Sequence, residues 1–115
     1  MLFRSLVGHL ANLEGGADVD LAAVPFLDGV RDLAERDLFP SGSRRNYEAY
    51  RDQVDWGGAA EIDQMMLCDA QTSGGLLVAI PRASADAFER VLVSAPYPAA
   101  RIGTINGHGS IRLRA

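Results

Sequence analysis

The chain has 115 residues, which is enough for one domain with a hydrophobic core but not for two. Its formal net charge of −4 leaves no basic surface for nucleic acid, and its single cysteine excludes an internal disulfide and any cysteine-rich zinc site. All eleven basic residues are arginine, so a Walker-type phosphate lysine, a Schiff-base lysine and an amine nucleophile are excluded as well.

Composition also bears on the compartment in which the protein is found. The chain is 48% hydrophobic and 23% charged, which is ordinary for a soluble globular domain. No apolar run approaches the length that spans a membrane, and no signal peptide opens the chain. The sequence therefore predicts a cytoplasmic protein with neither a membrane partner nor a nucleic-acid partner.

Hydrophobic periodicity predicts three elements in the first third of the chain. Leucines at positions i, i+4 and i+7 predict a helix over residues 5–14. Weak alternation over residues 17–24 predicts a short strand, which must stop before the following proline. Apolar residues at helical spacing then predict a second helix near residues 28–37.

The middle of the chain is predicted to contain a loop and two helical segments. Residues 39–46, Phe-Pro-Ser-Gly-Ser-Arg-Arg-Asn, are rich in turn formers and predict a loop. Tyr47, Tyr50 and Val54 are spaced so that they could share one helical face. Apolar residues between positions 62 and 66 predict a further helix.

The last third of the chain is predicted to hold a strand, a helix and a hairpin. Five consecutive apolar residues, 76–80, predict a central strand that is buried on both faces and ends at Pro81. Ser84 is placed to cap the helix that follows. Residues 100–105 and 110–115 flank a Gly-rich turn and predict a hairpin, and alternation in its second strand predicts one wet face. Interleaved helices and strands favour the α+β class, with a mixed sheet and helices packed on it.

Residues 69–75 are the first candidate for a ligand site. The two glycines can take positive φ, and successive backbone N–H groups would then form a concave anion site. The same composition also suits a plain helix-to-strand turn, in which the glycines relieve crowding and the polar groups satisfy the backbone. Spacing alone leaves both interpretations open. The candidate residues are Asp69, Gln71, Thr72, Ser73, Gly74 and Gly75.

A second candidate is the Ser/Gly-rich stretch that contains adjacent arginines. Arg44 and Arg45, followed by Asn46, could grip a phosphate through paired hydrogen bonds. The alternative is a solvated loop in which one arginine packs on a neighbour. His9 lies near the apolar stripe of the first predicted helix, where a packing role competes with a functional one. Cys68 follows an apolar helix end and, with no base nearby, is predicted to be a small buried residue.

Several ordered motifs resemble segments of the selenide, water dikinase (selenophosphate synthetase) family. "LCDAQTSGGLLVAI" at 67–80 resembles the family's Asp-Pro-Gln-Thr-Ser-Gly-Gly-Leu-Leu segment, and "PSGSRRNYEAY" at 40–50 resembles its Pro-Gly-Gly-Thr-Arg-Arg-Asn loop. "LVGHL", "VDLAAVPFLDGV" and the pair "ARIGTI" and "SIRLR" resemble other family segments in the family's order. Ala70 and Ser43 are two departures, and both are tolerable.

The resemblance implies a fold like that of aminoimidazole ribonucleotide synthetase and covers only its C-terminal domain. Residues 6–115 would form that domain, and the N-terminal ATP-binding domain of the family has no counterpart here. Residues 1–5 do not match the family. We expect them to be a non-native or truncated start, with an ordinary domain boundary as the alternative.

The resemblance also implies an activity for the intact parent. Family members make selenophosphate, AMP and phosphate from selenide, ATP and water with Mg²⁺, usually as homodimers. The reactive cysteine or selenocysteine and most metal-binding aspartates belong to the N-terminal part. No catalytic or metal-binding residue is therefore expected in this chain, which alone should be inactive and bind neither ATP nor Mg²⁺ tightly. The alternative is a non-catalytic binding or dimerisation module of the same fold.

Overall fold

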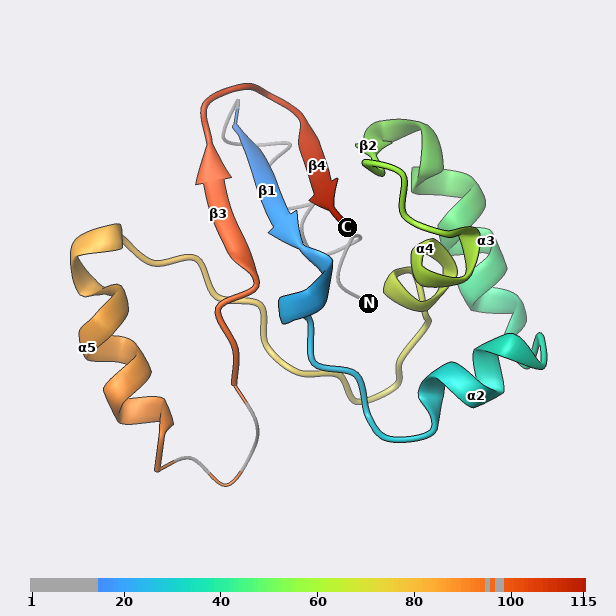
Figure 1. Cartoon of the computed structure of the whole chain (residues 1–115), viewed down its shortest axis with the longest axis horizontal. Helices are drawn as coiled ribbons and strands as arrows, with labels where there is room; N and C mark the ends of the chain where they lie inside the picture. The colour runs from blue at the N-terminus through green and yellow to red at the C-terminus, as the bar shows by residue number, and fades with distance from the viewer. Residues whose placement is uncertain (1–14, 95, 97–98) are drawn as a thin grey trace.

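The computed structural model describes residues 15–94, 96 and 99–115, and the helix expected over residues 5–14, with His9, lies outside them. A four-stranded mixed sheet of order β2-β4-β1-β3 lies at the centre, with helices on either side of it (Figure 1). The predicted α+β class is confirmed. None of the helices in the described ranges is long and apolar enough to cross a membrane.

Strand β1, Gly16–Asp20, lies between the two strands that end the chain. It pairs antiparallel with β3, Gly103–Asn106, and parallel with β4, Ile111–Arg114. The short strand β2, Val54–Asp55, pairs parallel with the other side of β4. The predicted first strand is thus confirmed but ends at residue 20, because Asp20 accepts a hydrogen bond from the Ala22 backbone and starts the 3-10 turn η1, Leu21–Ala23.

The predicted hairpin of β3 with β4 is wrong, because β1 occupies the place between them (Figure 1). The turn residues still reverse the chain, with Gly109 at φ 69°. Their connection crosses the start of β1, where the Ala17 N–H donates to the Ser110 carbonyl over 3.0 Å. The predicted alternation in the last strand is confirmed, since Ile111 and Leu113 are buried and the arginines between and after them are exposed.

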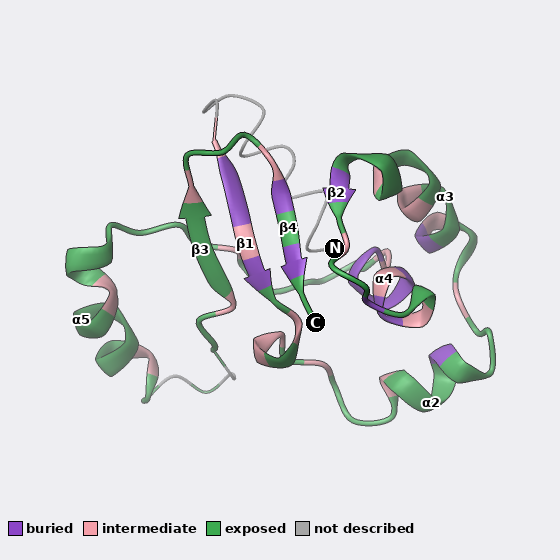
Figure 2. Ribbon diagram, turned by 45° about the horizontal axis from the view of Figure 1, so that its top comes forward, coloured by how far each residue is buried: buried purple, intermediate pink, exposed green. Residues whose placement is uncertain are grey.

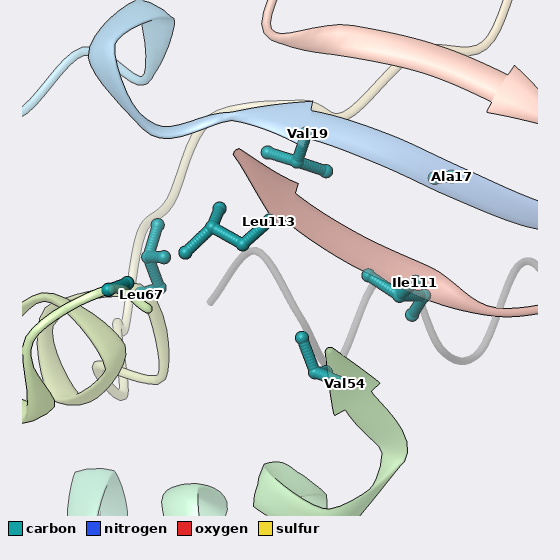
Figure 3. Close-up of a cluster of buried hydrophobic side chains, with 7 residues drawn as sticks. Ala17, Val19, Val54, Leu67, Ile111 and Leu113 are labelled. Carbon is teal, nitrogen blue, oxygen red and sulfur yellow. The ribbon is translucent and has the colours of Figure 1, made fainter. Parts of the chain in front are cut away.

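The core lies on one face of this sheet. Ala17 and Val19 of β1 and the two apolar residues of β4 point to the same side, where Val54 and Leu67 pack against them (Figure 3). Leu67 comes from α4, Glu61–Leu67, which confirms the helix predicted around residues 62–66. Burial is concentrated at β1, β4 and α4, while β3 is mostly exposed (Figure 2).

The predicted loop at residues 39–46 is wrong, because helix α3, Ser41–Tyr50, begins directly after Pro40. Its Ser and Gly residues occupy the first turn, where the Ser43 N–H donates to the Pro40 carbonyl over 3.0 Å. The 3-10 turn η2, Arg51–Gln53, ends the helix. Val54 therefore belongs to the sheet and shares no helical face with Tyr47 and Tyr50.

Two further helices differ in detail from their predictions. Helix α2, Val30–Glu35, confirms the helix expected near residues 28–37 but is shorter, beginning after Gly29 at φ 81°. Helix α5, Arg82–Leu92, begins after Pro81, so Ser84 lies inside its first turn and does not cap it. None of the residues of α5 is buried.

The central strand predicted at residues 76–80 is wrong. The segment has no regular structure and belongs to neither edge of the sheet. Leu76 is 94% exposed and Val78 is 51% exposed, while Leu77 between them packs against the core. An apolar run indicates that its side chains favour burial away from water. A strand also needs a neighbouring strand edge with free backbone groups.

Candidate functional site

The two motifs singled out in the sequence meet in space at one hydroxyl group. Ser43 of α3 is completely buried and donates a 2.6 Å hydrogen bond to Asp69 Oδ1, just beyond the end of α4. The same hydroxyl accepts a 2.9 Å hydrogen bond from the Ala70 backbone N–H. Ser43 therefore fixes both the carboxylate and the backbone at the start of the 69–75 segment. It was noted in the sequence only as a departure from the family pattern.

Asn46 and Tyr47 strengthen the same junction between α3 and α4. The Asn46 side-chain amide donates to the Cys68 carbonyl over 3.0 Å, which satisfies a backbone group at the end of α4. The Tyr47 hydroxyl donates to Gln64 Oε1 over 3.0 Å. Asn46, a phosphate candidate in the sequence, thus has a structural hydrogen bond of its own.

The adjacent arginines lie on a helix and point to different surroundings. Arg44 forms an exposed ion pair with Asp37, with 2.7 Å between Nη2 and Oδ1. Arg45 is exposed and has no hydrogen bond or ion pair to any other residue that the structure describes. Of the two cations, Arg45 is the one left available for an anion.

The glycines of the motif do not have the positive φ that one of the two interpretations considered for them. Positive φ values in the described ranges occur at four other glycines, and neither Gly74 nor Gly75 is among them. A Cβ atom at Gly74 would meet only the end of the flexible Gln71 side chain, and one at Gly75 would meet nothing within 4 Å. Neither glycine therefore uses the positive φ that the anion-site interpretation would have drawn on. Residues 71–75 form an exposed irregular segment.

A cavity of about 140 Å³ lies beside Asp69, between α2, α4 and the segment that joins α2 to α3. Asp69 is the one residue with a polar side chain among those that line it. Among the motif residues, Asp69 is the one that reaches this cavity. The apolar lining residues are Val30, Leu33, Ala34, Leu38, Phe39, Pro40 and Met66.

The remaining candidates are placed as follows. Cys68 is 1% exposed, and burial raises the pKa of its thiol to about 11, so it is the small buried residue that was predicted. His108, which lies in the turn that the sequence predicted between residues 105 and 110, is exposed after β3. In the part of the chain that the structure describes, no group of three or more His, Cys, Asp or Glu side chains is placed to hold a metal ion.

An ion pair that the sequence did not reveal joins α2 to α4. Arg31 donates to the carboxylate of Asp63, whose side chain is only 12% exposed. Asp63 lies one turn before Met66 and Leu67, on the buried side of its helix. A carboxylate in an apolar stripe is the signal that could have indicated this pair, because a buried charge requires a partner.

Comparison with known proteins identifies relatives for most of the chain. No family model matches it. Selenide, water dikinase of Pasteurella multocida is 40% identical over 91 residues, which are 76% of this chain and 24% of that protein. The proteins of the same name from Carboxydothermus hydrogenoformans and Pseudomonas aeruginosa are 34% and 35% identical, over 90% and 95% of this chain and 31% and 32% of theirs.

These similarities confirm the resemblance seen in the motifs. The chain spans about a quarter to a third of the length of these curated relatives. Over that stretch, it belongs to the selenide, water dikinase family.

Proposed function

We propose that this chain is the C-terminal part of an ATP-dependent phosphotransferase that makes selenophosphate from selenide, ATP and water, with AMP and phosphate as by-products. The observation that carries the proposal is its 34–40% identity to selenide, water dikinases over three quarters or more of its length. The product would serve selenocysteine and selenouridine synthesis. The parent would use ATP and Mg²⁺ in the cytoplasm, as a homodimer.

The described residues fit the phosphate groups of ATP better than they fit Mg²⁺. Thr72 and Ser73 are exposed residues with hydroxyl groups, and Arg45 is an exposed cation on the neighbouring helix. Such donors suit phosphate oxygens. Mg²⁺ prefers several oxygen ligands, and the described part of the chain gathers no carboxylate cluster that would hold it. We therefore assign no Mg²⁺ chemistry to the described residues.

In this proposal Ser43 supports the 69–75 segment and does not react. Its two hydrogen bonds hold Asp69 and the Ala70 backbone against α3, which leaves the residues that follow directed toward solvent. A firmly held start is what an exposed segment needs if it is to meet a phosphate group in one orientation. The nucleophile and the metal ligands would come from the remainder of the parent.

A chimera tests the proposal directly. The matched stretch of the Pasteurella multocida protein is replaced by the corresponding residues of this chain, and AMP formation is measured with ATP, Mg²⁺ and selenide. We expect selenide-dependent AMP formation by the chimera and none by the isolated chain. The same relative with the stretch deleted is the control. A folded chimera without activity would favour the alternative, a binding or dimerisation module.

A further inference from the structure

Asn106 ends β3, and Gly107 begins the connection that leads from β3 to β4 (Figure 1). Asparagine is a thermolabile residue, and an asparagine followed by glycine is the most prone to lose its side-chain amide. Glycine has no Cβ atom to keep its backbone nitrogen away from the side chain before it. In a folded protein the reaction depends on three groups: the glycine N–H, the asparagine side-chain carbonyl and the amide nitrogen that leaves.

The first of these groups, the Gly107 N–H, lies in an open part of the turn. Gly107 is exposed, and its N–H donates to no acceptor in the described part of the chain. A Cβ atom placed on Gly107 would meet nothing within 4 Å. Movement of this nitrogen toward the preceding side chain therefore breaks no hydrogen bond and displaces no described neighbour.

The other two groups belong to the Asn106 side chain, which is held by its carbonyl and not by its amide. Oδ1 accepts a 3.0 Å hydrogen bond from the His108 backbone N–H, which stabilises the negative charge that develops on this oxygen when Cγ is attacked. Nδ2 is buried and has no hydrogen-bond partner among the described residues. No hydrogen bond to those residues therefore has to break when this nitrogen leaves.

Asn46, the other asparagine in the described ranges, is placed in the opposite way. It lies in helix α3, its amide donates to the Cys68 carbonyl over 3.0 Å, and the bulky Tyr47 follows it. Its backbone is fixed by the helix and its leaving nitrogen is held. The same chain thus contains an asparagine whose surroundings oppose the reaction, which makes Asn46 an internal control.

We propose that Asn106 is a site of spontaneous deamidation, with water as the co-reactant. The Gly107 nitrogen gives its proton to water and forms a bond to Asn106 Cγ with its electron pair, which closes a succinimide ring. The Cγ–Nδ2 bond breaks, and Nδ2 takes up a proton and leaves as ammonia. Water then adds to either ring carbonyl and opens the ring, leaving aspartate or isoaspartate at position 106. Overall, asparagine and water are converted to an aspartyl residue and ammonia.

The product would weaken the pairing of β1 with β3. Asn106 pairs with Gly16, and a Cβ atom on Gly16 would lie 2.6 Å from Asn106 Oδ1, so the side chain lies directly against this strand. Deamidation puts a carboxylate where the buried amide was, and a buried charge without a partner opposes folding. Isoaspartate also lengthens the backbone at the start of the connection that crosses β1. The inference concerns the stability of the sheet and does not rest on the proposed reaction of the parent.

Peptide mass spectrometry of the purified chain tests the proposal. After incubation for several days at neutral pH, cleavage after arginine releases residues 102–112 and residues 46–51 as separate peptides, so both asparagines are measured in one sample. We expect residues 102–112 to deamidate at least about tenfold faster than residues 46–51, with isoaspartate among the products. Equal rates would overturn the assignment. A rate in the folded chain more than about tenfold below that of the free peptide 102–112 would also overturn it, because the fold would then protect the site.

Gly107→Ala isolates the ring-closing step. Gly107 is not among the glycines with positive φ, and the added methyl group would meet nothing within 4 Å, so the variant should keep the melting temperature of the unaltered chain. Its deamidation at Asn106 should be at least about tenfold slower, because the methyl group hinders the approach of the nitrogen to Cγ. An unchanged rate would refute attack by the Gly107 nitrogen.

Asn106→Asp tests the consequence for the sheet. The substitution should lower the melting temperature by several degrees, because it places a carboxylate at the buried amide position. His108→Asp is the matched control, since it adds a negative charge at an exposed position in the same turn and should leave the melting temperature unchanged. Equal effects of the two variants would contradict the predicted weakening of the sheet.

Discussion

Ser43 and Asp69, 26 positions apart in the chain, are joined by a 2.6 Å hydrogen bond beneath the surface at the end of α4. The bond connects two motifs that sequence similarity identifies separately. Because Ser43 also accepts the Ala70 N–H, one side chain determines where the exposed 71–75 segment leaves the core.

Ser43→Ala should destabilise the chain by about 1–3 kcal/mol, because it leaves the Ala70 N–H and one Asp69 oxygen without their buried partner. The free energy of unfolding is measured by urea denaturation. Ser41→Ala is the control, since Ser41 is exposed in the same helix. A loss no greater than that of the control would show that the junction contributes nothing to stability.

Arg31→Ala should cost more stability than Arg44→Ala. Arg31 neutralises Asp63, whose side chain is 12% exposed, so its removal leaves a nearly buried carboxylate unpaired. Arg44 pairs with Asp37, which is 75% exposed, and such surface pairs contribute about 0–1 kcal/mol. We expect Arg31→Ala to cost roughly 1–3 kcal/mol by urea denaturation, the lower range reflecting the half-exposed guanidinium. Equal losses would place Asp63 in a more solvated site than the structure shows.

Gly57→Ala and Gly74→Ala should differ in their effects on stability. Gly57 has φ 57°, and a Cβ atom there would lie 2.1 Å from the Leu113 carbonyl oxygen, so the substitution should cost more than about 1 kcal/mol. Gly74 lacks a positive φ and would meet only a flexible side chain, so its effect should stay within about 0.5 kcal/mol. Thermal unfolding of both variants provides the measurement, and the opposite order would refute the backbone argument.

The stability of the chain should fall as the pH rises from about 9 toward 11, through Cys68. Burial raises the pKa of its thiol from 9.0 to about 11, so in that range the folded state holds a proton that the unfolded state has lost. Stability is therefore fully present below pH 9 and decreases above it, by roughly 2 kcal/mol at pH 11.

Cys68→Ala provides the matched comparison for this pH effect. Its unfolding free energy should depend less on pH between 9 and 11 than that of the unaltered chain. The same burial should keep the thiol from reacting with iodoacetamide at pH 8 until the chain is unfolded. Rapid alkylation of the folded chain would contradict both expectations.

The local pattern of apolar and polar residues was sufficient to predict the helix and the strand that bury only one of their faces. The alternation of Ile111 and Leu113 with arginines predicted the wet and dry faces of β4, and the apolar spacing at residues 62–66 predicted α4. Ordered motifs were also sufficient for the family. The two elements could be predicted from residues that are close in sequence, because side chains on one face repeat with the period of the helix or strand.

Only the tertiary structure decided which segments became partners. β1 separates β3 from β4, although a turn-rich connection suggested a hairpin, because pairing depends on which backbone edge is available and not on the turn alone. The stretch at residues 41–46 became helical where the buried Ser43 hydroxyl could bond Asp69 and Ala70. The run at 76–80 found no edge within the described chain, so its apolar composition did not make it a strand. Hydrophobic pattern determines which groups leave water, and long-range backbone geometry determines where they go.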